Sequence, residues 1–211
     1  AGYAAGIALL APLGDLLDRK RLILAKSALL VLALLTTAAA SHLAVFLAAS
    51  GALGVLGSVG QDFIPVSAQL ASAEKRGRTI GLVTTGLLCG ILLSRTAGGV
   101  IGDLFGWQAI YGIAAVLVAL VGLAVWRVLP RQPAMASGTY GSLLASLLTL
   151  VVRQGVLRKA LATQALLAST LGAFWSTLAL VLAEPPFSLG ASVAGAFGLA
   201  GAAGAFGAPL F

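Results

Sequence analysis

The sequence predicts an all-α fold of the polytopic helical membrane class, and two observations carry this prediction. Hydrophobic residues make up 60% of the 211 positions and charged residues only 9%, whereas an ordinary soluble domain is about 25% charged. The 27 glycines suit helices that associate in lipid, where small residues let backbones approach closely. The composition therefore excludes a water-soluble globule.

Apolar runs of about 20 residues, the length that crosses a bilayer, follow one another between charged residues. They predict seven crossings, the first of them partial: residues 1–13, 22–41, 43–70, 79–101, 109–126, 160–183 and 188–211. The chain starts at Ala1, no charged segment precedes the first run, and no polar segment follows the last run. We therefore expect the chain to be a segment of a longer protein.

The basic residues test this assignment, because Lys and Arg collect in cytoplasmic loops. Twelve of the 13 fall in the first, third and fifth predicted loops, and the second, fourth and sixth have none. The three groups are Arg19, Lys20, Arg21 and Lys26; Lys75, Arg76 and Arg78; and Arg127, Arg131, Arg153, Arg158 and Lys159. The net charge of +7 thus reflects orientation in a lipid bilayer, and nucleic acid is not an expected partner.

The long connection at residues 127–159 contains an apolar segment, residues 142–153, that is too short to cross a bilayer. Both of its flanks are basic, so a crossing would carry one basic group to the other side. One helical face is expected to be apolar and the opposite face polar. The apolar face holds Leu143, Leu144, Leu147, Leu148 and Val151, and the polar face holds Ser142, Ser146, Thr149 and Arg153. We expect a helix that lies in the membrane interface, and we place the domain boundary in this linker.

Arg95 is the thirteenth basic residue and lies inside a predicted crossing. An Arg at the centre of a membrane helix costs about 2.5 to 3.5 kcal/mol on insertion scales and normally faces a cavity or a partner. One reading is a fixed cation that binds an anionic solute group or modulates a proton carrier. The other is a structural ion pair or a side chain that reaches to the interface.

Asp62 follows Gln61 and precedes Pro65 in a run otherwise free of charge. A carboxylate in such a run is a candidate proton carrier, with a purely structural role as the alternative. We place Gln61 with Asp62 and Arg95 in a candidate pathway for solute and protons. The distance of Asp62 along the helix from the basic loops is shorter than that of Arg95, so a direct salt bridge between them is not expected, although a shared hydrated cavity stays open.

Glycines recur at every third position over residues 51–60 and 195–207. Each run gives its helix a surface poor in side chains, which allows either tight static packing or sliding. Pro65 removes a backbone donor within its helix, and such breaks often lie beside cavities, although core packing explains a proline equally well.

No residues support catalysis or metal binding. The sequence has no nucleophile elbow, zinc-protease helix, phosphate-binding loop or paired carboxylates at a useful spacing. His42 and Cys89 have no neighbours with metal-ligand spacing, and a single Cys excludes an internal disulfide. We expect neither an enzyme nor a protein with a metal or cofactor.

Three segments resemble signatures of the major facilitator superfamily. Gly14, followed by Asp18 and Arg19 and then by basic residues, resembles its loop between the second and third helices. Residues 74–78 resemble its acidic-basic loop between the fourth and fifth helices. In the third segment, Gly86, Gly90, Gly98 and Gly99 resemble the glycine-rich fifth-helix signature of proton-driven exporters, and residues 106–109 after them resemble the family's outer turn. Arg95, within residues 94–96 of the same segment, resembles the drug and arabinose-efflux branch.

The resemblance implies helices two to eight of a twelve-helix transporter fold. It implies an N-terminal bundle that lacks its first helix (residues 1–129), a cytoplasmic linker (130–159) and the start of a C-terminal bundle (160–211). It also implies an integral protein of the bacterial cytoplasmic (inner) membrane whose partners are a small solute, protons and the remainder of its own chain.

The activity implied by the resemblance is proton-coupled antiport that exports a small organic solute by rocking two bundles. Asp18, Arg19 and Arg78 would form a cytoplasmic charge network, and Gly14 would belong to the same loop. The four glycines of the fifth helix would let the bundles close. An uptake transporter, or a non-transporting scaffold or receptor of the same fold, remains the alternative.

Overall fold

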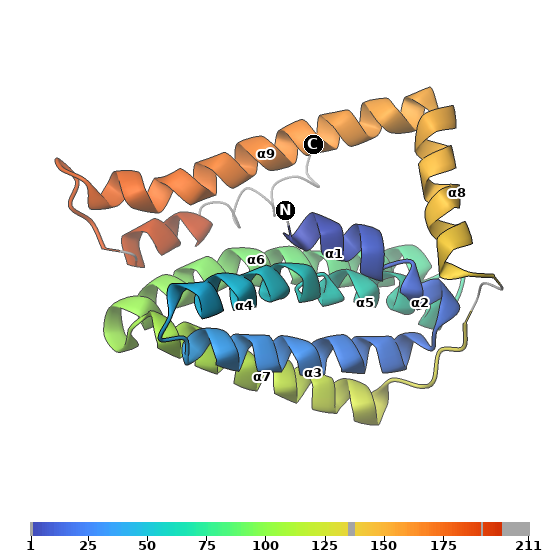
Figure 1. Cartoon of the computed structure of the whole chain (residues 1–211), viewed down its shortest axis with the longest axis horizontal. Helices are drawn as coiled ribbons and strands as arrows, with labels where there is room; N and C mark the ends of the chain where they lie inside the picture. The colour runs from blue at the N-terminus through green and yellow to red at the C-terminus, as the bar shows by residue number, and fades with distance from the viewer. Residues whose placement is uncertain (1, 135–137, 191, 200–211) are drawn as a thin grey trace.

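The computed structural model describes residues 2–134, 138–190 and 192–199 as long helices joined by short connections (Figure 1). The described residues contain no strand, which confirms the all-α prediction. Residues 192–199 are helical, and the helices before them are α1 (Gly2–Leu10), α2 (Leu13–Leu16), α3 (Arg19–Ala38), α4 (Leu43–Leu56), α5 (Val59–Leu70), α6 (Arg76–Phe105), α7 (Trp107–Val128), α8 (Tyr140–Arg153) and α9 (Gly155–Ala183).

Within the described ranges, five stretches are long and apolar enough to cross a membrane. They are Arg19–Ala38, Leu43–Leu70, Arg76–Phe105, Trp107–Val128 and Gly155–Ala183, and each overlaps one predicted crossing. The partial first crossing forms α1 and α2. The last predicted crossing is described only as far as residue 199, so its end and the glycines at 201, 204 and 207 lie outside the described residues.

The core of the bundle forms where α3 packs along α7 and against α4 and α5. Ile23, Leu30 and Leu34 of α3 are buried there with Ala115 and Val125 of α7. Most other large apolar side chains are exposed on the outer surfaces of the helices. Apolar surface of this extent does not occur on soluble monomers, so the exposure pattern is that of helices covered by lipid.

Local sequence fixes several helix ends. The Asp18 carboxylate accepts hydrogen bonds from the backbone N–H groups of Lys20 and Arg21 and so caps α3. The Thr139 hydroxyl caps α8 in the same way, through the N–H of Ser142. Gly106 has a φ of 82°, a conformation open to glycine, and it lets the chain reverse between α6 and α7.

The predicted crossing at Leu43–Leu70 is one span but two helices, since the chain leaves the helix at residues 57–58. Here α1 passes so close that a Cβ on Gly6 would lie 2.1 Å from the Val55 carbonyl oxygen. The Ser58 hydroxyl donates to the same carbonyl at 2.8 Å. Gly54 of α4 also serves close packing, since a Cβ there would lie 3.2 Å from the Gly2 Cα of α1. Pro65 lies within α5, after the interruption.

The basic residues gather at one end of the bundle, where α3 begins, α5 ends, α6 begins and α7 ends (Figure 1). We call this the basic end. Most of these residues lie in terminal helical turns rather than in the loops that we expected, because the helices extend into those loops. The expectation of a loop position is wrong for Lys26, which lies within α3 and is only 3% exposed.

Two elements complete the arrangement in Figure 1. Helix α8 lies at the basic end and runs across the direction of the long helices. Residues 192–199 return beside α6, where the Thr96 hydroxyl donates to the Gly195 carbonyl at 2.7 Å.

Candidate functional site

A buried ion pair joins two crossings near the basic end. The Lys26 ammonium nitrogen on α3 lies 2.5 Å from a carboxylate oxygen of Asp62 on α5, and the two residues are 3% and 8% exposed. Opposite charges removed from water are tolerated when they pair, and removing either partner leaves a charge without compensation. The pair is therefore a candidate two-state element.

A cavity of about 530 Å³ opens beside this pair between α1, α2, α5 and α8. We call it the charged cavity, because two carboxylates and one guanidinium line it. Its lining residues are Ile7, Ala8, Ala11, Pro12, Asp15, Arg19, Gln61, Asp62, Pro65, Leu143, Ser146 and Leu147. The structure thus brings the predicted residues Gln61 and Asp62 together with Arg19 in one space.

Polar groups of the charged cavity are only partly satisfied by one another. Arg19 forms an ion pair with Asp15, and the Gln61 amide donates to the Tyr3 hydroxyl at 2.9 Å. The Nε of Arg19 is buried and has no hydrogen-bond partner in the described part of the chain. A buried donor of this kind needs water or a bound ligand, so the cavity is suited to a polar occupant.

Pro65 contributes to this site through its backbone. A proline within a helix supplies no N–H, so the Gln61 carbonyl, four residues earlier, lacks its usual helical donor. Both residues line the charged cavity. The missing helical bond thus falls at a residue of the cavity lining.

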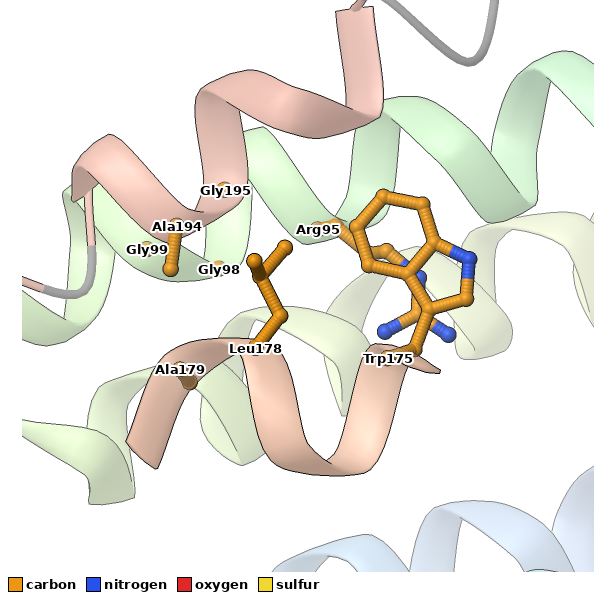
Figure 2. Close-up of a pocket in the computed structure, with 8 residues that line it drawn as sticks. All are labelled: Arg95, Gly98, Gly99, Trp175, Leu178, Ala179, Ala194 and Gly195. Atoms are coloured by element: carbon orange, nitrogen blue, oxygen red, sulfur yellow. The ribbon is translucent and has the colours of Figure 1, made fainter. Parts of the chain in front are cut away.

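Arg95 lies in a different cavity, of about 250 Å³, between α6, α9 and residues 192–199 (Figure 2). Its guanidinium carbon lies 4.2 Å from the centroid of the Trp175 ring, a cation–π contact. The remaining lining is small or apolar: Gly98, Gly99, Leu178, Ala179, Ala194 and Gly195. No carboxylate lines this cavity among the described residues, so its one charge is positive.

Of the glycines expected to assist closure, Gly98 and Gly99 line the Arg95 cavity, whereas Gly86 and Gly90 face open space on α6. The glycines that allow a close approach to α6 lie instead in the helix at residues 192–199. A Cβ on Gly195 would lie 2.6 Å from the Arg95 carbonyl oxygen, and one on Gly198 would lie 2.6 Å from that of Leu92.

The residues of the expected cytoplasmic network lie at the basic end but have separate partners. Asp18 caps α3, and Arg19 pairs with Asp15. Gly14 is buried, and a Cβ added there would lie 3.7 Å from the Arg19 Cγ. Arg78 lies exposed in the first turn of α6, and among the described residues no ion pair or hydrogen bond joins it to Asp18.

The architecture and the signatures agree with the comparison to protein families. Residues 1–211 match the family described as Major Facilitator Superfamily. The chain belongs to the major facilitator superfamily. It is therefore a helical membrane protein of a transporter family and not an enzyme.

Relatives of this major facilitator chain are bacterial proteins named as transporters. The "Uncharacterized transporter YgaY" of Escherichia coli O157:H7 is 40% identical over 194 residues, which are 92% of this chain and 49% of that protein. The "Probable transporter SCO4007" of Streptomyces coelicolor is 37% identical over 210 residues, 99% of this chain and 49% of that protein. The chain thus spans about half the length of these curated relatives.

A more distant relative is the "Probable sugar efflux transporter" of Helicobacter pylori strain 26695, 28% identical over 130 residues, which are 60% of this chain and 32% of that protein. No solved structure matches the chain.

Three residues of this major facilitator chain were missed from sequence. Lys26 is expected in a loop, although it is the fifth residue of the predicted crossing 22–41. Its position inside that crossing is the sequence signal that it is buried in a helix. Trp175 and Tyr3 contact Arg95 and Gln61 across helices far apart in sequence. Nothing in a single sequence pairs those helices.

Proposed function

We propose that this chain works in secondary active transport, as part of a proton-coupled exporter that moves a small organic solute by alternating access. The observation that carries the proposal is the buried Lys26–Asp62 pair on the wall of a cavity. Buried ionisable groups in membrane spans commonly mark proton or substrate paths.

The pair suggests how a proton couples to a change of state. In the present arrangement the Asp62 carboxylate offsets the Lys26 charge at 2.5 Å. A proton on Asp62 removes the negative charge and leaves Lys26 as a buried cation without compensation, which is unfavourable. Protonation therefore destabilises the packing of α3 against α5 seen here and favours a rearranged state, and release of the proton restores the pair.

The solute has two candidate contacts on this chain. Gln61, with its carbonyl and amide beside Asp62, offers neutral hydrogen-bonding groups in the charged cavity. Arg95 offers a cation beside the Trp175 ring in the smaller cavity. Asp18, Arg19 and Arg78 are proposed to latch one state at the basic end, and Gly14, Gly86, Gly90, Gly98 and Gly99 to permit the approach of helices in the other.

Family and relatives support transport, and the name of the Helicobacter pylori relative supports export of a sugar-like solute. The positive-inside rule places the basic end on the cytoplasmic face, and the bacterial relatives support a bacterial inner membrane. Residues 1–129, 130–159 and 160–211 are proposed as first bundle, linker and start of the second bundle.

The test is solute-dependent proton movement in sealed proteoliposomes that contain the protein and a pH-sensitive dye. A panel of neutral sugars and organic anions is added under an imposed pH gradient. Solute movement that carries protons in the opposite direction supports an antiporter, and movement in the same direction supports the uptake alternative. Solute binding without movement of solute or protons supports a scaffold or receptor.

A further inference from the structure

Helix α8 has one face toward the protein and another toward its surroundings. Leu143, Ser146 and Leu147 line the charged cavity, and the Tyr140 hydroxyl donates to the Leu9 carbonyl of α1 at 2.7 Å. With 14 residues the helix is about 21 Å long, shorter than the roughly 30 Å hydrocarbon core. Since it runs across the long helices at the basic end (Figure 1), it lies along a membrane surface when those helices cross the bilayer.

The outward surface of α8 is apolar and uncovered by the described protein. Leu148 and Val152 are 68% and 67% exposed, and Val156 at the start of α9 is 84% exposed. A groove of about 310 Å³ lies among Leu148, Thr149, Val152 and Arg153. Apolar side chains next to a cation make a surface that suits an amphiphile.

Three cations lie at the corner where α8 ends and α9 begins. Arg153 ends α8, and Arg158 and Lys159 follow in the first turns of α9, all three exposed. The Arg158 guanidinium donates to the Val152 carbonyl at 3.2 Å, which holds the start of α9 against the end of α8. The sequence contains no acidic residue between Asp103 and Glu184, and within the described residues no ion pair joins these three cations to a carboxylate.

We propose that the outward face of α8, together with Arg153, Arg158 and Lys159, binds anionic phospholipid from the adjoining leaflet. The phosphate-bearing headgroup lies against the three cations, and an acyl chain lies over Leu148 and Val152. Charge complementarity decides for an anionic lipid over a zwitterionic one, since a cluster of Lys and Arg attracts anionic headgroups. The opposite face of α8 forms one wall of the charged cavity. The bound lipid therefore holds that wall in place, whether or not the protein transports.

The test places a fluorophore in the groove. Cys89 is replaced by Ser, Thr149→Cys is labelled with bimane, and the protein is reconstituted in phosphatidylcholine vesicles. Quenching by spin-labelled phosphatidylglycerol is then compared with quenching by spin-labelled phosphatidylcholine. The proposal predicts a strong preference for the anionic lipid, which a label with equal access to both lipids would contradict.

Two double variants separate a local site from general positive charge. Arg153→Gln with Lys159→Gln removes two cations of the corner and leaves the Arg158–Val152 bond intact. The proposal predicts about a 30-fold loss of preference for phosphatidylglycerol, since each basic residue at an anionic surface contributes about 1 kcal/mol. Arg127→Gln with Arg131→Gln, at the other end of the linker, removes the same charge and should leave the preference unchanged. An equal loss in both variants, or no loss in the first, overturns the proposal.

Discussion

The Lys26 ammonium group and the Asp62 carboxylate lie 2.5 Å apart on two different crossings, although the two residues are 36 positions apart in sequence. Each is the charge that offsets the other in a buried region. The contact ties α3 to α5 beside the charged cavity, so a change in the charge of either residue acts on both the packing and the cavity wall.

Replacement of Asp62 by Asn should destabilise the protein. The substitution keeps the shape of the side chain but leaves Lys26 buried without a counter-charge, a loss of about 3 to 5 kcal/mol. The measurement is the midpoint of thermal unfolding in detergent, which should fall by several degrees. The double replacement Lys26→Met with Asp62→Leu removes both charges and should recover most of the loss. An Asn variant as stable as the parent would show that the pair does not hold α3 to α5.

Replacement of Gly6 by Ala should also lower the unfolding midpoint. The new methyl group would lie 2.1 Å from the Val55 carbonyl oxygen, so α1 and α4 must separate, and overpacking of this kind costs about 1 to 3 kcal/mol. The matched control is Gly51→Ala on α4, where the added methyl meets open space. A Gly6 variant as stable as the Gly51 variant would contradict the close approach of α1 to α4.

Replacement of Arg95 by Ala should abolish solute-linked proton movement without loss of membrane insertion. The change removes the cation of the smaller cavity and the stacking on Trp175. The fluorescence of Trp175, isolated by replacing Trp107 and Trp126 with Phe, should change when the cation is lost. Arg95→Lys is the control for charge alone. Normal solute-linked flux in the Ala variant would rule out a role for Arg95 in the proposed transport.

Replacement of Gly195 by Ala should loosen residues 192–199 from α6. The methyl group would lie 2.6 Å from the Arg95 carbonyl oxygen and would displace the hydrogen bond between Thr96 and the Gly195 carbonyl. Amide hydrogen exchange over residues 192–199 should become faster by tenfold or more, which corresponds to about 1.4 kcal/mol of local stability. Gly86→Ala, on the open side of α6, should leave that exchange unchanged, and equal exchange in both variants would contradict the packing.

Much of the fold follows from the sequence, because span length and charge placement are set by the bilayer. The Leu43–Leu70 crossing has the predicted bounds, and α8 forms where a short amphipathic run stands between basic flanks. The break at residues 57–58 was not predicted. It depends on the approach of α1 at Gly6, a contact between distant segments that local propensity does not contain.

The site was predictable only in part. Asp62 is a candidate from sequence because a lone carboxylate in an apolar run is costly, and the structure places it with its neighbour Gln61 on one cavity wall. Their partners were not predicted. The positive-inside pattern groups Lys26 with the first basic loop, whereas in the structure Asp62 offers it a buried counter-charge.

The central claim is that the Lys26–Asp62 pair couples protons to solute movement, and one comparison tests it most directly. The parent protein and the variant Lys26→Met with Asp62→Asn are reconstituted in proteoliposomes, and solute exchange and solute-dependent proton flux are measured in the same vesicles. The account predicts that the variant still exchanges solute across the membrane but moves no protons with it. Proton flux in the variant equal to that of the parent, at the same rate of solute movement, would contradict the account.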